Sequence, residues 1–210
     1  MTDPQAADSG LSATELSSSE YVDQKFEHLT LTDTELRDKS FYDCEFLHCN
    51  FTESRLLNCR FDACRFVDCN LSTAKIKGTA FQEVTFENCK LVGIDWTTAR
   101  WPSVALSGMI SFDACILDGS SFFGLYLQEL KLEACHAHDV DFAEADCEHA
   151  SFIQTDFDNS TFHHTKLAKA DFTDALNYAI DVHTNSIAGA KFNLPEAVSL
   201  LRGLGIELVG

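Results

Sequence analysis

Apolar residues recur at every fifth position along most of this chain. The series runs without a gap from Phe26 to Leu106 and resumes, after one step of six residues, from Phe112 to Phe172. A second, usually smaller residue, often Cys, Ala, Ser or Thr, stands two places before each member of the series, and the other positions are mostly polar. In each unit, these two residues are therefore expected to face a core.

A period of five matches neither the α-helix, which repeats every 3.6 residues, nor a simple β-strand, which alternates every two. A solenoid explains it, because each unit turns its two inward residues toward a shared interior and the chain then bends. One coil cannot bury its own core, whereas stacked coils can. The pattern therefore predicts a stack of short, repeated units.

The units resemble those of a known family. CNFTE, CNLST, ADFTD and TKLAK are similar to the consensus A(D/N)LXX of the pentapeptide-repeat proteins, and the resemblance covers residues 26–172. It implies an all-β solenoid, a right-handed quadrilateral β-helix in which four pentapeptides make one square coil and residues one coil apart stack. The expected internal ladders are Phe26, Phe46, Phe66 and Phe86 on one side, and Phe41, Phe61, Phe81 and Trp101 on another.

The six-residue step falls in LSGMISF, residues 106–112. One extra residue is expected to shift the register and bend the rod, with Gly108 as a hinge that supplies backbone freedom. A similar glycine separates the two parts of the Qnr-type quinolone-resistance proteins, which belong to the same family. The predicted segments are a flexible N-terminal tail or cap (1–20), a first β-helix part (21–107), a second β-helix part (108–175) and a C-terminal capping or dimerisation segment (176–210).

Beyond Phe172 the series of five fails. The remaining sequence predicts a helix that begins at Pro195 and ends at Gly203, followed by a short strand over 205–209. Such a segment would cover the open end of the solenoid. Qnr and MfpA-like proteins end in a comparable helix and strand that pair two chains, so the resemblance implies a homodimer, with a monomeric cap as the alternative. The residues expected at the dimer surface are Leu194, Val198, Leu201, Leu204, Ile206 and Leu208.

The nine cysteines follow the core pattern. Eight stand two places before an apolar residue, as Cys49 and Cys69 do, and Cys147 is itself a member of the series. Their odd number, in a protein expected to be cytoplasmic, argues against a disulfide framework. Zinc fingers need ligands that converge tetrahedrally, whereas these thiols would lie in parallel rows. They are predicted to be small, buried core residues.

Acidic residues concentrate in the second part. The net charge of −18 disfavours direct binding to nucleic acid or to an anionic membrane. The sequence indicates neither a signal peptide nor a membrane span, so a cytoplasmic location is expected. Between Asp113 and Asp174 there are thirteen acidic and three basic residues. The candidate partner-binding residues are Asp118, Asp139, Asp156 and Asp158 on one predicted side, and Asp141 and Glu144 on the next.

Catalytic motifs are absent from the sequence. It contains no glycine-rich phosphate loop, no G-x-S-x-G elbow and no H-E-x-x-H motif, so neither an enzyme nor a cofactor is predicted. Two outer columns place histidines near carboxylates, namely His28, His48 and Asp68, and Asp118, His138 and Asp158. Because a flat wall offers no closed surroundings for an ion, surface charge compensation is favoured over metal binding.

Two functions are consistent with these observations. The resemblance to Qnr and MfpA-like proteins implies a DNA mimic, in which an acidic β-helix dimer binds DNA gyrase or topoisomerase IV and modulates it or protects it from quinolones or other poisons. The alternative is a pentapeptide-repeat scaffold for an unrelated protein, since a fold does not fix a function. Unlike many Qnr proteins, both parts run without loop insertions, as in MfpA. Arg55, Arg60 and Arg65 make the first part less suited to mimicry.

Overall fold

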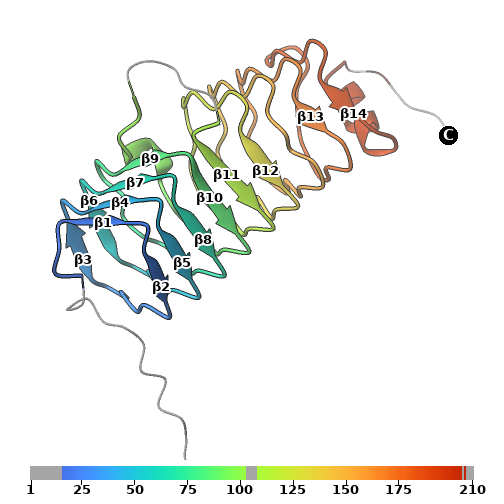
Figure 1. The fold of residues 1–210 in the computed structure, drawn as a ribbon. Coiled ribbons are helices and arrows are strands. Elements are labelled where there is room, and N and C mark those ends of the chain that lie inside the picture. Colours follow the sequence, from blue (N-terminus) through green and yellow to red (C-terminus); the bar gives the residue numbers. More distant parts are fainter. Residues whose placement is uncertain (1–15, 103–107, 205, 207–210) are drawn as a thin grey trace, which may run out of the picture.

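The computed structural model describes residues 16–102, 108–204 and 206. In Figure 1 these residues form an elongated stack of coils that advances from the N-terminal end (blue) to the C-terminal end (red). All of the paired strands are parallel, and the predicted all-β solenoid is confirmed. Within the described ranges, no helix has both the length and the apolar character needed to cross a membrane.

The strands are short because the chain turns after every unit. They are β1 (Glu20–Val22), β2 (Lys25–Glu27), β3 (Glu35–Arg37), β4 (Ser40–Tyr42), β5 (Glu45–Leu47), β6 (Arg55–Leu57), β7 (Arg60–Asp62), β8 (Arg65–Val67), β9 (Ala80–Gln82), β10 (Val84–Glu87), β11 (Ile110–Asp113), β12 (Lys131–Glu133), β13 (Asp171–Phe172) and β14 (Lys191–Phe192). Helical turns of the 3-10 type span Trp96–Thr98 and Glu196–Leu204.

Strands and single bridges together build the four sides of the coils. One side is the sheet β1-β4-β7-β9, a second is β2-β5-β8-β10-β11-β12, and a third contains β3-β6. Single bridges such as Thr30–Asn50 and Asn50–Asn70 hold the fourth side. Where the coils are regular, each residue of a side pairs with the residue twenty positions later, as Phe46 pairs with Phe66.

The corners explain the period of five. The second residue after most inward apolar residues has a left-handed backbone, as at His48, Asn58 and Asp68, each with a φ of 53°. Asn, Asp and His tolerate this conformation better than β-branched or bulky residues do. The polar corner residue thus turns the chain and lets the next apolar residue point inward again.

The interior is a set of stacked aromatic ladders. Phe66 is fully buried and stacks between Phe46, at 4.6 Å between ring centroids, and Phe86, at 5.0 Å. Phe61 of the adjacent ladder meets the Phe66 ring edge-on at 5.4 Å. The predicted ladder from Phe26 to Phe86 is therefore confirmed.

The second predicted ladder is only partly correct. Phe41, Phe61 and Phe81 stack as expected, at 5.0 and 5.6 Å. Trp101 is instead half-buried, and its Nε1 donates a hydrogen bond to the Trp96 carbonyl at 2.9 Å. The Phe81 ring packs edge-on against Trp96, at 5.4 Å. Trp96, from the adjacent side of the coil, thus contacts the end of this ladder.

The six-residue step does not interrupt the sheet. β10 pairs with β11 so that Phe86 lies opposite Phe112, with ring centroids 5.3 Å apart. The step was expected to add one residue, but this coil takes six more residues than usual, so Phe112 and not Leu106 follows Phe86 in its ladder. Leu106 itself lies outside the described residues. Gly108 has a φ of 64°, and its role as a hinge or domain boundary stays a prediction.

The solenoid also continues past Phe172, contrary to the prediction that the repeat ends there. β13 pairs with β14, and Phe192 stacks on Phe172 at 5.0 Å. Residues 176–192 therefore complete one more coil and do not belong to the cap. The pattern was hidden because Phe162 pairs with Ile180, eighteen residues later, where the regular spacing is twenty.

Both ends differ in part from the predicted segments. At the N-terminal end, Leu16 is buried in the core and β1 begins at Glu20, so the end of the predicted tail belongs to the solenoid. At the other end, the predicted helix is the 3-10 helix Glu196–Leu204. The predicted strand over 205–209 lies outside the described residues except for Ile206, which is not in a strand.

Candidate protein-interaction surface

The six predicted contact acids lie on two adjacent sides of the second part. Bridges align His136 with Asp156 on one side and Asp141 with Thr161 on the next. Asp139 lies at the corner between these sides and has a φ of 54°. We name this surface the acidic wall, and it consists of Asp118, Asp139, Asp141, Glu144, Asp156 and Asp158.

The acids of the wall fall into two groups. Asp118, Asp141 and Asp156 are half-buried, and each accepts a backbone hydrogen bond. The donors are the N–H groups of His138 (3.1 Å), Ala143 (2.9 Å) and Asp158 (3.2 Å), respectively. The other three, Asp139, Glu144 and Asp158, are exposed. In the first group, the Asp118 bond joins successive coils and the other two bonds fix the chain within one unit. The second group faces solvent.

Histidine and carboxylate interact at the centre of the wall. His138 Nε2 lies 3.1 Å from Asp156 Oδ2. Partial burial opposes the charged form of His138, but Asp156, with Asp118 and Asp158, outweighs this effect and raises the pKa of His138. Burial likewise opposes the charge on Asp156, yet hydrogen bonds from Asn177 and His138 lower its pKa. Among the described residues, none of the six wall acids forms an ion pair with Lys or Arg.

The His138–Asp156 pair predicts a pH-dependent stability. Because the pKa of His138 is raised above its ordinary value of 6.5, its stabilising effect is fully present below about pH 6.5 and is lost as the pH rises through the folded-state pKa. Replacing His138 with Gln should therefore destabilise the protein more at pH 5.5 than at pH 8.5. Urea unfolding of both proteins at the two pH values measures this difference, and an equal loss at both would contradict it.

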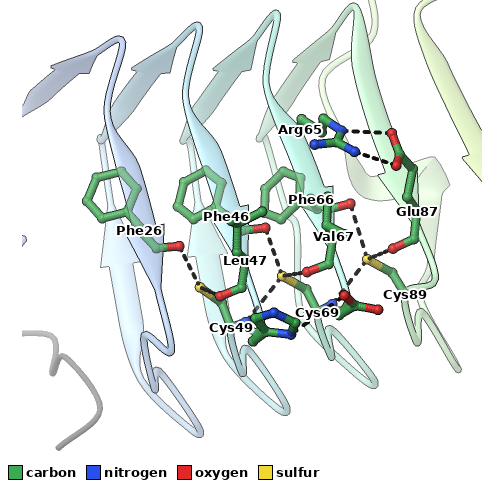
Figure 2. Close-up of polar contacts among 12 residues, drawn as sticks. Phe26, Phe46, Leu47, Cys49, Arg65, Phe66, Val67, Cys69, Glu87 and Cys89 are labelled. Atoms are coloured by element: carbon green, nitrogen blue, oxygen red, sulfur yellow. Dashed lines mark hydrogen bonds and ion pairs between the residues drawn. The ribbon is translucent and has the colours of Figure 1, made fainter.

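Charges in the first part are mostly paired. Arg65 bonds Glu87 at 2.6 Å, as Figure 2 shows, and lies 3.7 Å from Glu45. The hydrogen bond from Arg65 lowers the pKa of Glu87. Arg55 lies 3.3 Å from Asp33. These arginines compensate acids along the coils, and the ten basic residues among 21–102 leave this part with a net charge of only −3.

The cysteines are core residues, as predicted. All nine are free and buried. In the column drawn in Figure 2, the Cys49 N–H donates to Cys69 Sγ, and the Cys69 N–H donates to Cys89 Sγ, both at 3.3 Å. Each thiol of this column also bonds backbone carbonyls, as Cys69 Sγ does with Phe46 O at 3.3 Å. Burial raises the pKa of Cys64 to about 12, so such thiols stay protonated.

These N–H···S bonds give the thiols a measurable structural role. Replacing Cys69 with Ala leaves the buried Cys49 N–H without its acceptor, and the expected loss of stability is about 1–3 kcal/mol. Cys69→Ser keeps an acceptor and should lose less. Thr79, which occupies the same small inward position in another unit, supports this, because its Oγ1 accepts the Cys59 N–H at 3.1 Å. Urea unfolding compares the two variants, and equal losses would show that volume alone matters.

The two predicted histidine columns differ in structure. His28 and His48 stack at 5.3 Å, and His48 Nδ1 lies 3.6 Å from Asp68 Oδ2. In the described part of the chain, no three His, Cys, Asp or Glu side chains are arranged to hold a metal ion. In the other column, His138 contacts Asp118 through its backbone and Asp156 through its ring. Asp156 was not part of the predicted trio.

Sequence reasoning missed two exposed apolar residues beside the wall. Phe123 is 46% exposed and Leu176 is 50% exposed. Phe123 follows Phe122 and is out of phase with the series of five, which is the signal that could have identified it. Leu176 continues the column of Asp156, in the coil that the sequence pattern did not reveal.

The predicted dimer surface is partly exposed. Leu194, Val198, Leu204 and Ile206 are exposed at the C-terminal end of the rod. Leu201 is half-buried, and Leu208 lies outside the described residues. An apolar surface at the end of the rod is compatible with pairing of two chains, which stays a prediction.

The geometry defines a β-solenoid whose second part is more acidic than its first part. The chain belongs to the pentapeptide repeat family, since the family model of the pentapeptide repeat region matches residues 39–109 and 94–172. No curated protein matches the chain.

Solved structures of other pentapeptide-repeat proteins share the fold. A trypsin-treated variant of QnrB1, a plasmid-mediated fluoroquinolone resistance protein, has a TM-score of 0.62 at 17% identity and covers 91% of this chain and 99% of that one. HetL, a pentapeptide repeat protein involved in heterocyst differentiation regulation in a Nostoc cyanobacterium, has a TM-score of 0.54 at 14% identity, covering 84% and 88%. At these identities the similarity shows a shared fold, and a shared fold does not by itself imply a shared function.

Proposed function

We propose that this protein is a non-enzymatic DNA mimic that acts in the cytoplasm as a homodimer. Its acidic wall binds the basic DNA-binding surface of a type II topoisomerase such as DNA gyrase. Binding there modulates the enzyme or protects it from quinolones and other poisons. The observation that carries this proposal is the concentration of uncompensated, exposed acids on two adjacent sides of the second part.

The charge per unit length supports mimicry by the second part. Residues 113–174 make about three coils of roughly 4.8 Å each and carry thirteen acidic and three basic residues. This gives one net negative charge per about 1.5 Å of axis, close to the ~1.7 Å of duplex DNA. Residues 21–102 also carry thirteen acids, but ten bases reduce their net charge to −3. Only the second part therefore approaches the charge density of DNA.

The resemblance to QnrB1 supports the same partner. QnrB1 is named for fluoroquinolone resistance, and it aligns over almost its whole length with this chain. The acidic surface is the chemical complement of a protein groove that normally holds DNA.

A second candidate is a scaffold for an unrelated protein. HetL shares the fold, yet its name refers to the regulation of cell differentiation. The paired charges of the first part, such as Arg65 with Glu87, would form a flat surface of mixed sign for such a partner.

A supercoiling assay separates the two candidates. Purified protein is added to DNA gyrase with and without a quinolone, and both supercoiling and cleavage complexes are measured. The DNA-mimic proposal expects a change in at least one of them at micromolar protein that weakens as salt is raised. No change in either would leave the scaffold as the remaining function.

A further inference from the structure

The last coil contains a cavity that the DNA-mimic proposal does not use. Its volume is about 580 Å³, which falls in the range of roughly 300–1,000 Å³ found for small-molecule sites. Residues of the last coil and of the 3-10 helix Glu196–Leu204 line it, and Asp158 is its only residue from the acidic wall. The lining residues are Asp158, Asn177, Tyr178, Ala179, Ile180, Asp181, Glu196 and Ser199.

An irregularity of the coil places Tyr178 in the interior beside this cavity. On this side Phe162 pairs with Ile180, so the inward residue comes two positions earlier than the regular spacing of twenty gives. Asn177 takes the left-handed backbone, with a φ of 56°, and Tyr178 turns inward. The Tyr178 ring packs against Phe172, at 5.5 Å, and Phe192, at 5.4 Å. The tyrosine is therefore held by the last two described rings of one ladder.

Two buried hydroxyl groups in the lining have no partner among the described residues. Tyr178 is only 2% exposed, and its Oη makes no hydrogen bond with any described residue. Ser199 Oγ is likewise buried without a described partner. Native proteins rarely leave such groups unpaired, so each marks a place where a further polar group would fit. Burial, with the nearby charge of Glu196, raises the pKa of Tyr178 to about 12, so its hydroxyl is neutral.

The remaining lining residues define the charge of the group that would fit. Asp158, Asp181 and Glu196 contribute three carboxylates, and no Lys or Arg is among the described lining residues. The Asn177 N–H holds Glu196 Oε1 at 3.0 Å. Ala179 and Ile180 add apolar contacts. Carboxylates and hydroxyl oxygens accept hydrogen bonds from an ammonium group, and the apolar residues suit an aliphatic chain.

We propose that this cavity binds a small alkylammonium ligand of the polyamine class. Its ammonium groups pair with Asp158, Asp181 and Glu196 and donate to the Tyr178 and Ser199 hydroxyls, while its methylene groups pack on Ala179 and Ile180. This site does not depend on topoisomerase binding, and its test uses only the protein and the amine.

Isothermal titration calorimetry with spermidine tests the site in the full chain. We expect one site per chain, retained at 150 mM salt. Glu196→Gln keeps the acceptor for the Asn177 N–H but removes the charge, and it should weaken binding about tenfold or more. Tyr178→Phe should weaken it about threefold or more without changing charge. The control Asp139→Asn removes the same charge from the wall outside the cavity, and it should change affinity less than about twofold.

Thermal unfolding of the free proteins gives a second measurement. Since Tyr178→Phe removes an unpartnered buried hydroxyl, the free variant should unfold at a higher temperature than wild type and be stabilised less by spermidine. Many weak sites, or equal effects of Glu196→Gln and Asp139→Asn, would overturn the proposal in favour of diffuse attraction to an acidic rod. No effect of Tyr178→Phe on either binding or stability would also overturn it.

Discussion

Reversing the three exposed acids of the wall, in the variant D139K/E144K/D158K, should weaken binding to DNA gyrase about a hundredfold or more. Each reversal turns an attraction for a basic groove into a repulsion, and about 1 kcal/mol per site is sufficient for this factor. These side chains are exposed, so the solenoid should remain folded. Surface plasmon resonance at two salt concentrations measures the affinity, and the variant should also show a flatter salt dependence.

The first part supplies a matched control. Asp23, Asp38 and Asp43 are exposed corner residues with left-handed backbones, as Asp139 and Glu144 are. The variant D23K/D38K/D43K changes the net charge by the same amount and should bind nearly as well as wild type. Equal losses in the two variants would mean that gyrase senses total charge and not the wall. Unchanged binding in D139K/E144K/D158K would place the interface elsewhere.

The fold was predictable from sequence because its causes are local and repeated. Most units contain an inward Phe or Leu, a small residue two places before it and a polar corner residue. Because residues twenty apart pair, as Phe46 and Phe66 do, the pattern of one coil predicts the pattern of the next. The cysteine column was predictable for the same reason, since Cys49 and Cys69 occupy the same position in successive units. The extra coil was not predictable, because Tyr178 and Ile180 occupy inward positions that are out of phase with the series.

The acidic wall was predictable as a group, but the roles of its members were not. Asp118 and Asp158 occupy equivalent positions in the sequence pattern. In the structure Asp118 is half-buried and accepts the N–H of His138 from the next coil. Tyr178 stands one coil after Asp158, as His138 stands one coil after Asp118. Because Tyr178 turns inward, Asp158 remains exposed. The exposure of one acid thus depends on an irregularity twenty residues away, which no local pattern contains.

Replacing Phe66 with Ala should produce the largest loss of stability of any single substitution considered for this protein. Phe66 is fully buried and stacked on both faces, by Phe46 and Phe86. Loss of a buried Phe side chain costs about 3–5 kcal/mol, a large part of the roughly 5–15 kcal/mol that stabilises a typical domain. Urea unfolding monitored by circular dichroism measures the loss. Phe123→Ala, at an exposed position, is the control and should change stability by no more than about 0.5 kcal/mol.

The loss should also depend on the position in the ladder. Phe192 stands at the end of the described ladder and is half-buried. One ring, Phe172, stacks on it at 5.0 Å, and Tyr178 lies tilted against it at 5.4 Å. In a solenoid each coil contacts only its neighbours, so a terminal ring loses one stacking interface where an internal ring loses two. Phe192→Ala should therefore cost less than half as much as Phe66→Ala. If the two substitutions were equally destabilising, stability would not be a sum of contacts between neighbouring coils, and the terminal coil would be as essential as the centre of the rod.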